Sequence, residues 1–380
     1  MSCTQIARLA AYAALSLALG SLTSQANAAP YTFTDLGALP GHTNSQANGI
    51  NDVGQVVGLS YPGVVTDLRA ALWNGSTITD LGGASGTLSR AFAINSAGQV
   101  VGFTDVAGNG NQKATVWNGT TATVLTTLGG TISGASGINN SGQIVGYSLT
   151  VGNVAQRAVL WNGTTPTDLG TLGGAHSGAN AINSGGQVAG WATFSTASSA
   201  SRATIWNGTI ATDLGTLGGS FSYSSVANGI NDVGQVVGFS STTGNTISRA
   251  TLWNGTVATD LGTLGGTISY ANSINNAGLV VGNSFTAGNA AQHATLWNGT
   301  VITDLNTLLD ASAVSAGWIL QDAKGINASG WIVGTASNSI SGFEHAFLLT
   351  PVPEPETYAM MLAGLCLVGF AARHKGRRSA

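Results

Sequence analysis

Short runs of alternating apolar and polar residues follow one another along most of the chain, with turn residues between them. One stretch reads Gly-Ile-Asn-Asp-Val-Gly-Gln-Val-Val-Gly from residue 229, and another reads Arg-Ala-Thr-Leu-Trp-Asn-Gly-Thr from residue 249. A two-residue alternation bounded by Gly, Asn and Asp is typical of short β-strands. Between the chain ends, no segment carries the apolar period of a long helix. The pattern therefore predicts an all-β protein.

The same strand pattern recurs at a nearly constant interval. The triplet Trp-Asn-Gly returns every 44 to 47 residues, at Trp73, Trp117, Trp161, Trp206, Trp253 and Trp297. An Ile-Asn pair followed by a Gly-containing strand occurs in seven copies, at Ile50, Ile94, Ile138, Ile182, Ile230, Ile274 and Ile326. Each unit holds four strand candidates, which we name a to d in chain order. Four strands in a unit of this size are typical of a β-propeller blade.

The two ends of the repeat array complement each other. The segment Tyr31–Leu36 resembles a strand d with no a, b or c before it, whereas Gly330–Val333 and His345–Leu349 resemble b and c with no d after them. A ring closed by its own N-terminal strand leaves no sheet edge exposed. We therefore expect residues 29–350 to form a seven-bladed β-propeller of four-stranded blades, closed by the N-terminal strand.

Within each blade, the repeated residues predict structural roles. Asn-Gly between two strands favours a type I′ turn, and a turn at that pair would place Arg157 opposite Asp168 and Arg249 opposite Asp260. The same arithmetic pairs Arg69 with Asp80, Arg202 with Asp213, and His293 with Asp304, while His345 would meet Asp35 in the closing blade. We expect these pairs to fix strand register and the six Trp residues to pack between strands.

The two chain ends carry targeting patterns. Residues 1–28 have a basic start, an apolar run and a small-residue exit, which predicts a secretory signal peptide. Residues 351–380 contain Pro353, Glu354 and Pro355, then an apolar run and a basic tail. This order resembles the PEP-CTERM sorting signal of exported Gram-negative proteins. The resemblance implies processing by an exosortase-type enzyme, transient membrane insertion of the C-terminal segment, and an extracellular or cell-surface location. A plain tail anchor is the alternative.

The repeat unit itself resembles the HAF repeat of exported bacterial proteins. The namesake triplet is His345-Ala346-Phe347, and the other copies place Arg, Lys or His before Ala. The resemblance implies a secreted or surface protein and no established reaction.

Composition narrows the function classes. The chain has 380 residues, 55 of them Gly, with 7% charged residues and a net charge of −3, which argues against nucleic-acid binding. The five His lack metal-ligand spacing, and the two cysteines, Cys3 and Cys366, lie in the targeting segments. We expect no cofactor, no metal and no enzymatic activity.

Aromatic and His residues in the longer connections are the candidate ligand-binding residues. They occur among Ser, Thr and Asn, a mixture that suits sugar rings. They are His176, Phe221, Tyr223, Tyr270 and Trp318. The alternative is that these side chains pack under their own loops.

The sequence therefore predicts a secreted, non-catalytic binding or structural module of the envelope or exopolysaccharide matrix, with extracellular polysaccharide as a candidate partner. The alternative is an extracellular glycan-active hydrolase or lyase, which would place two carboxylates, or a His and a Tyr, together on the rim with the long connections. A third class, a protein-binding platform, would expose an apolar patch there.

Overall fold

The computed structural model describes residues 31–63, 67–83, 88–106, 111–195, 200–219, 225–244 and 247–352. The predicted signal peptide and the residues Pro353, Glu354 and Pro355 lie outside this part of the chain. Phe33–Pro351 form one compact unit, and the two chain ends are grouped as a second. The fold described below is that of the first unit.

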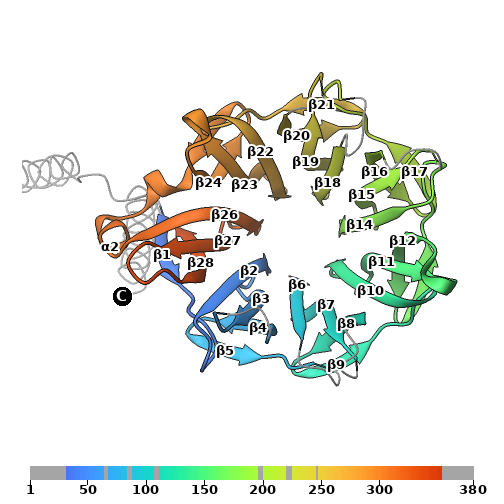
Figure 1. The fold of residues 1–380 in the computed structure, drawn as a ribbon, viewed down its shortest axis with the longest axis horizontal. Helices are drawn as coiled ribbons and strands as arrows, with labels where there is room; N and C mark the ends of the chain where they lie inside the picture. The colour runs from blue at the N-terminus through green and yellow to red at the C-terminus, as the bar shows by residue number, and fades with distance from the viewer. Residues whose placement is uncertain are drawn as a thin grey trace, which may run out of the picture. The chain divides into compact units, whose positions relative to one another are not determined.

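Seven four-stranded antiparallel sheets surround a central axis (Figure 1), as the repeat predicted. The innermost strands, a, are β2 (Asn44–Ile50), β6 (Ser89–Ile94), β10 (Gly129–Ile138), β14 (Ser177–Ile182), β18 (Ser225–Ile230), β22 (Gly265–Ile274) and β26 (Trp318–Ile326). The b strands are β3 (Val56–Tyr61), β7 (Gln99–Asp105), β11 (Ile144–Thr150), β15 (Val188–Thr193), β19 (Gln235–Ser241), β23 (Leu279–Thr286) and β27 (Ile332–Asn338).

The outer half of each blade is a c–d hairpin, except in the seventh. The c strands are β4 (Arg69–Asn74), β8 (Gln112–Asn118), β12 (Gln156–Asn162), β16 (Ser201–Asn207), β20 (Ser248–Asn254), β24 (Gln292–Asn298) and β28 (Glu344–Pro351). The d strands are β5 (Thr77–Asp80), β9 (Thr121–Val124), β13 (Thr165–Asp168), β17 (Ile210–Asp213), β21 (Val257–Asp260), β25 (Val301–Asp304) and β1 (Tyr31–Asp35). Blades 1 to 7 are numbered from β2.

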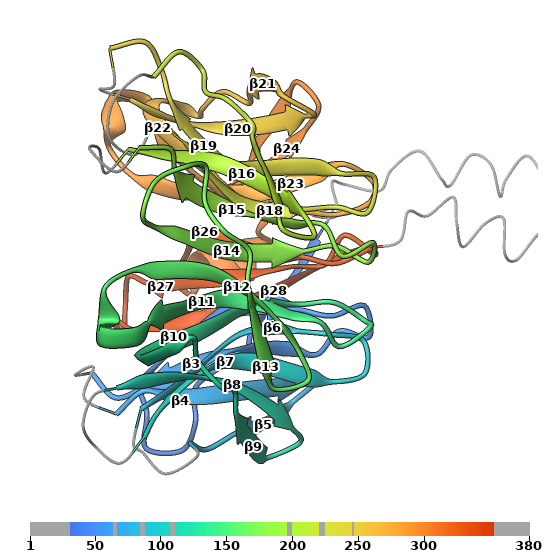
Figure 2. The same cartoon turned by 90° about the vertical axis from the view of Figure 1, so that its right-hand side faces the viewer.

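Among the described residues, helix is confined to short pieces in the connections. They are the 3₁₀ segments η2 (Val151–Asn153), η3 (Ala287–Asn289) and η4 (Leu305–Leu308), and the α-helix α2 (Ala311–Ser315). The side view in Figure 2 shows the strands running between two rims. The a–b and c–d turns form the short-turn rim, and the b–c and d–a connections form the long-connection rim.

The N-terminal strand closes the ring, as predicted. The seventh sheet has the order β1-β28-β27-β26, so β1 supplies its fourth strand. The backbone N–H of Leu36 donates to the carbonyl of Ala346 at 2.9 Å, and His345 Nδ1 lies 2.8 Å from Asp35 Oδ1. The Asp35 hydrogen bond raises the pKa of His345 above its usual value, against the lowering effect of burial.

The predicted register of the c–d hairpins is wrong by two residues. Asn254 pairs with Val257 and Thr251 with Asp260, so the two turn residues are Gly255 and Thr256. Gly255 has φ +61°, and Asn254 and Thr256 have no positive φ. A turn with positive φ at its first central residue alone is type II′, not type I′. The Asn of each Asn-Gly pair therefore belongs to the strand.

The opposite-charge pairs survive this shift because a two-residue slip keeps each side chain on the same face. The predicted partners meet diagonally, at 3.2 Å for Arg69–Asp80 and 2.6 Å for His293–Asp304. Longer contacts of 3.8 and 3.9 Å join Arg157 to Asp168 and Arg202 to Asp213. Within the described residues, Arg249 makes no ion pair with Asp260.

The repeated Gly of strand b marks a close approach of two strands. A Cβ at Gly238 would lie 2.0 Å from the carbonyl oxygen of Val226 on the neighbouring strand a. The seven equivalent distances are 1.9–2.1 Å, at Gly58, Gly102, Gly146, Gly190, Gly238, Gly282 and Gly334. No side chain fits there, which explains why every copy of the repeat carries Gly.

Apolar cores lie between successive blades. One cluster joins Val57 and Ala70 of blade 1 to Val100 and Trp117 of blade 2. The six repeated Trp side chains are 0–1% exposed. Buried Ser side chains add hydrogen bonds between blades: the Ala158 N–H of blade 3 donates to Ser177 Oγ of blade 4 at 2.9 Å. Five further blade pairs repeat this bond at 2.9 Å.

Candidate functional site: the axial channel and its long-connection rim

The axial channel is divided by a ring of isoleucines. The seven Ile residues of the repeated Ile-Asn pairs line both of two cavities, one on each side of the ring. The turn-side chamber lies toward the short-turn rim and has a cavity volume of about 210 Å³. The loop-side chamber lies toward the long-connection rim and has a volume of about 310 Å³.

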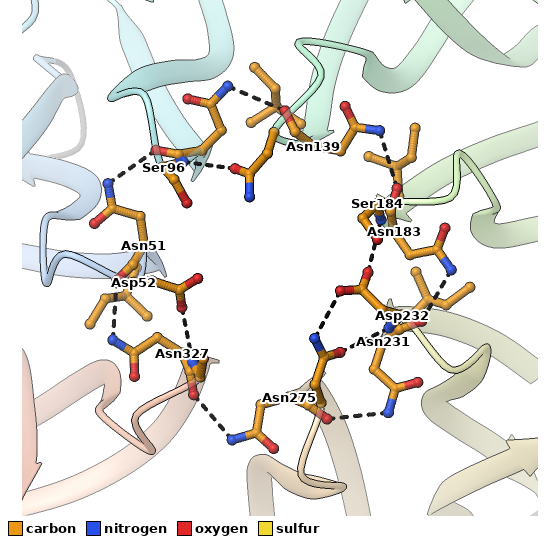
Figure 3. Close-up of a pocket in the computed structure, with 18 of the residues that line it drawn as sticks. Asn51, Asp52, Ser96, Asn139, Asn183, Ser184, Asn231, Asp232, Asn275 and Asn327 are labelled. Carbon is orange, nitrogen blue, oxygen red and sulfur yellow. Dashed lines mark hydrogen bonds between the residues drawn. The ribbon is translucent and has the colours of Figure 1, made fainter.

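A closed ring of asparagines forms the wall of the turn-side chamber (Figure 3). Each Asn Nδ2 donates to the backbone carbonyl of the corresponding Asn in the next blade, at 3.0–3.2 Å. The members of this asparagine ring are Asn51, Asn95, Asn139, Asn183, Asn231, Asn275 and Asn327, each 3–6% exposed. The last of these bonds, from Asn327 to Asn51, joins blade 7 to blade 1.

Each ring asparagine also holds its own a–b turn. The Asn139 Oδ1 accepts from the backbone N–H of Gln143 at 3.0 Å, and its Nδ2 lies 2.8 Å from Gln143 Oε1. The backbone bond recurs in all seven blades. A buried amide costs little when all its groups are paired. The asparagine ring is therefore a structural network.

The two aspartates of the turn-side chamber also take part in hydrogen bonds between blades. Asp52 Oδ1 accepts from the Ala328 N–H at 3.0 Å, across the blade 7–blade 1 junction. Asp232 accepts from the Ser184 N–H at 2.9 Å and from Asn276 Nδ2 at 2.8 Å. The Ser184 backbone bond, followed by the side-chain bonds, lowers the pKa of Asp232. Both carboxylates bind backbone groups of the preceding blade.

The loop-side chamber is lined by residues that differ from blade to blade. Two residues before each ring Ile, a β-bulge leaves one residue of strand a without a cross-strand partner, and bulges re-aim side chains. These residues all line the chamber and are Asn48, Phe92, Ser136, Asn180, Asn228, Asn272 and Lys324. The bulge thus recurs in every blade, whereas the side chain at the bulged position is Asn in four blades and Phe, Ser or Lys in the other three.

A polar cluster lies beside this chamber in blades 6 and 7. Asp322 Oδ1 accepts from Asn272 Nδ2 at 2.7 Å and from Asn283 Nδ2 at 2.9 Å, while Oδ2 lies 2.5 Å from Lys324 Nζ. The Asp322 side chain is 14% exposed and that of Lys324 is 37% exposed. The lysine is therefore the member of the cluster that solvent reaches most easily.

A second charged cluster joins blades 7, 1 and 2. Glu344 Oε2 accepts from the Tyr61 hydroxyl at 3.1 Å and from Gln46 Nε2 at 3.3 Å. Burial is the main cause that raises the pKa of Tyr61 to about 12, and the Glu344 carboxylate is the next largest. The Arg90 guanidinium lies 4.9 Å from the centroid of the Phe92 ring, and burial lowers the pKa of Arg90.

Four aromatic residues follow the repeated Gly of strand b in successive blades. This aromatic arc consists of Phe103, Tyr147, Trp191 and Phe239, from blades 2 to 5. The opposing residues of strand a leave room for two of the rings: a Cβ at Gly134 or Gly178 would lie 2.8 Å from Tyr147 or Trp191. Tyr147, Trp191 and Phe239 are half-buried; Tyr147 lies at the centre of its strand, and Trp191 and Phe239 lie just beyond the centre toward the long-connection end.

The candidate residues expected from the sequence have separate surroundings. Exposed His176 accepts from the Gln156 N–H through Nδ1 at 3.2 Å. Tyr270 packs edge-on against Phe239, with ring centroids 5.0 Å apart. Trp318 packs against Phe33 and His345 in the closing blade. These three residues belong to different blades, and no contact joins them. Phe221 and Tyr223 lie outside the described residues.

The aromatic arc and the chamber residues were missed by the sequence interpretation, which searched the loops. Both sets had a signal in the aligned repeats. The position after the strand-b Gly is aromatic in four successive copies, and the position before Gly-Ile-Asn, Ala-Ile-Asn or Ser-Ile-Asn varies. Positions that depart from a repeat are those that the scaffold does not require.

The described residues lack two further features. Within these residues, no group of three or more His, Cys, Asp or Glu side chains could hold a metal ion. No helix in the same part of the chain has the length and apolar character needed to cross a membrane.

Comparisons with known proteins address the C-terminus and the fold. No curated protein sequence matches the chain. Among solved structures, the chain is similar to a gluconolactonase from Xanthomonas campestris, with a TM-score of 0.43 and 10% identity over 85% of this chain and 90% of that chain. A putative gluconolactonase gives a TM-score of 0.40 and 8% identity over 85% and 93%. Neither likeness is close enough to carry an argument about activity.

Residues 351–378 match the model of the PEP-CTERM protein-sorting motif. This match covers the C-terminal segment in which the sequence placed Pro353, Glu354 and Pro355, and it says nothing about the propeller. The motif implies processing by an exosortase. The chain is therefore that of an exported protein sorted through its C-terminus.

Proposed function

We propose that this exported propeller is a non-catalytic module that binds extracellular polysaccharide through its long-connection rim, at the surface or in the matrix of a Gram-negative cell. The HAF-type repeat, in this proposal, supplies the scaffold. The observation that carries the proposal is the aromatic arc: four successive blades place an aromatic residue at one position of strand b. Flat apolar faces beside hydrogen-bonding side chains suit a chain of sugar rings.

The pKa shifts and hydrogen-bond partners of the Asp, Glu and Tyr side chains support binding over catalysis. A general acid or base works best with a pKa near the operating pH. The pKa of Asp232 is lowered and that of Tyr61 is raised to about 12, so both move away from that range. Asp322, which lies beside the loop-side chamber, and Glu344 are each held by two or more side chains. These groups suit positioning rather than proton transfer.

The test is a glycan array probed with the propeller unit, residues 29–352, which contains all seven blades and the closing strand. We expect polysaccharide binding that falls at least tenfold in Trp191→Ala. Ile210→Ala is the matched control, because Ile210 is exposed beside a c–d turn on the opposite rim. Release of new reducing ends or unsaturated sugars from the bound glycan would contradict the non-catalytic proposal, and equal loss in both variants would contradict the site.

A further inference from the structure

The loop-side chamber has unused hydrogen-bonding groups. Four of its lining residues are asparagines whose Nδ2 atoms donate to a carbonyl of the next blade: Asn48 to Ala91, Asn180 to Ala227, Asn228 to Ala271 and Asn272 to Ala323, at 2.7–2.9 Å. Their Oδ1 atoms have no hydrogen-bond partner among the described residues. Carbonyl oxygens accept hydrogen bonds and cannot donate them. The wall therefore requires donors from whatever fills the chamber.

Lys324 adds hydrogen-bond donors to these acceptors. It is the one cationic side chain that lines the chamber in the described structure. One Nζ contact goes to Asp322, and an ammonium group has three N–H donors. The Lys324–Asp322 pair has no net charge, and the second carboxylate oxygen of Asp322 is already used by Asn272 and Asn283. The chamber thus offers donors to a neutral acceptor rather than an excess positive charge to an anion.

The chamber also has apolar surfaces. The isoleucine ring forms the floor, and the Phe92 ring forms part of the wall. The volume of about 310 Å³ lies at the lower end of the range for small-molecule sites, about 300–1,000 Å³. The ligand must therefore be small, have several hydroxyl donors and at least one acceptor, and present an apolar face.

We propose that the loop-side chamber binds one neutral hexopyranose unit, at the end of a glycan whose following units lie along the long-connection rim. Hydroxyls of the sugar donate to the Oδ1 atoms of the four asparagines, and a ring or hydroxyl oxygen accepts from Lys324 Nζ. A uronate binds more weakly, because its carboxylate meets carbonyl oxygens on the wall and lies near Asp322. This proposal rests on the proposed polysaccharide binding and names its terminal subsite.

The test is calorimetric titration of the propeller unit with methyl glycosides of glucose, galactose and mannose, and with glucuronate. We expect at least one neutral glycoside to bind, and to bind more tightly than glucuronate. Lys324→Gln weakens this binding at least tenfold. The control Lys113→Gln removes the same charge from strand β8, outside the chamber lining, and changes the affinity less than twofold.

A second variant tests the chamber without removing a charge or a hydrogen bond of the described residues. Ser136→Phe fills the volume with the residue that blade 2 carries at the same position, Phe92, so the backbone is known to accommodate it. We expect at least a tenfold loss of glycoside affinity and an unchanged Tm. Equal affinity in Ser136→Phe and the wild type, or tighter binding of glucuronate than of every neutral glycoside, overturns the proposal.

The two proposals fail in different ways. If the wild type binds polysaccharide on the array and loses it in Trp191→Ala, but binds no monosaccharide glycoside, the terminal subsite is wrong and the polysaccharide site stands. If the wild type binds no glycan in either experiment, both proposals are wrong.

Discussion

At the scale of single residues, the ring asparagine accounts for the Ile-Asn pair that all seven repeats share. One amide caps the a–b turn of its own blade and binds the backbone of the next blade. Asn is suited to this because its short side chain carries both a donor and an acceptor. Asp would lack the donor, and Gln would place the amide about one bond too far. This geometry explains why all seven copies carry Asn.

Replacing one ring asparagine is expected to be costly. Asn139→Ala leaves the Asn183 carbonyl and the Gln143 N–H without their partner, and each buried unpaired group costs about 1–3 kcal/mol. We predict a loss of about 2–4 kcal/mol in the free energy of unfolding, measured by chemical denaturation. Asn118→Ala, at an exposed strand end of the adjacent blade, should change it by about 0.5 kcal/mol or less. Similar losses in the two variants would contradict the role of the ring.

The sequence shows these asparagines only as part of a repeated Ile-Asn pair, because the partner of each one is a carbonyl 44 to 52 residues away in six copies and 276 residues away in the seventh. Nothing local shows that those groups meet, since their contact depends on closure of the whole ring. The Trp residues were easier to interpret, because a large apolar side chain in a strand predicts burial whatever its partners are.

At the scale of elements, the c–d hairpins show why the sequence could not distinguish two strand registers that differ by two residues. Asn-Gly and Gly-Thr are both acceptable two-residue turns, and both registers keep Arg and Asp on one face. The ion pairs therefore form in either register and cannot distinguish them. The backbone decides: Gly255 has a positive φ and Asn254 does not.

Two substitutions separate the two turn types. A Cβ at Gly255 meets no atom within 4 Å, so Gly255→Ala is opposed only by the backbone conformation, at about 1–3 kcal/mol. Asn254→Thr places a good strand former in a strand and should leave Tm within about 2 °C. In a type I′ turn both residues would need positive φ. A large decrease in the Tm of Asn254→Thr, measured by thermal unfolding, would therefore support the type I′ turn predicted from the sequence.

At the scale of the whole molecule, closure was predicted by counting strands, and β1 completes the seventh sheet. The binding surface could not be predicted by counting strands. The aromatic arc and the bulged residues lie in strands that look regular in the sequence, and their common side of the ring appears only when the blades are assembled. The loops, where binding residues are usually sought, gave candidates in separate blades.

The closing contact is expected to depend on pH. Asp35 raises the pKa of His345 in the folded protein, so the stabilisation is complete below the unfolded His pKa of about 6.5 and is lost as pH rises through the higher folded value. We predict that the Tm difference between wild type and Asp35→Asn is larger at pH 6 than at pH 8.5. Parallel Tm profiles for the two proteins would contradict this contribution.

The central claim is a division of labour: the asparagine ring and the six repeated Trp residues build the propeller, and the aromatic arc and the residues of the loop-side chamber bind the ligand. The most direct measurement is the glycan dissociation constant and the Tm of Trp191→Ala and Asn139→Ala, side by side with the wild type. We predict that Trp191→Ala weakens glycan binding at least tenfold with a Tm shift of about 2 °C or less, whereas Asn139→Ala lowers Tm by several degrees and leaves the affinity of the folded protein within twofold. Loss of affinity in Asn139→Ala with unchanged affinity in Trp191→Ala would contradict the claim.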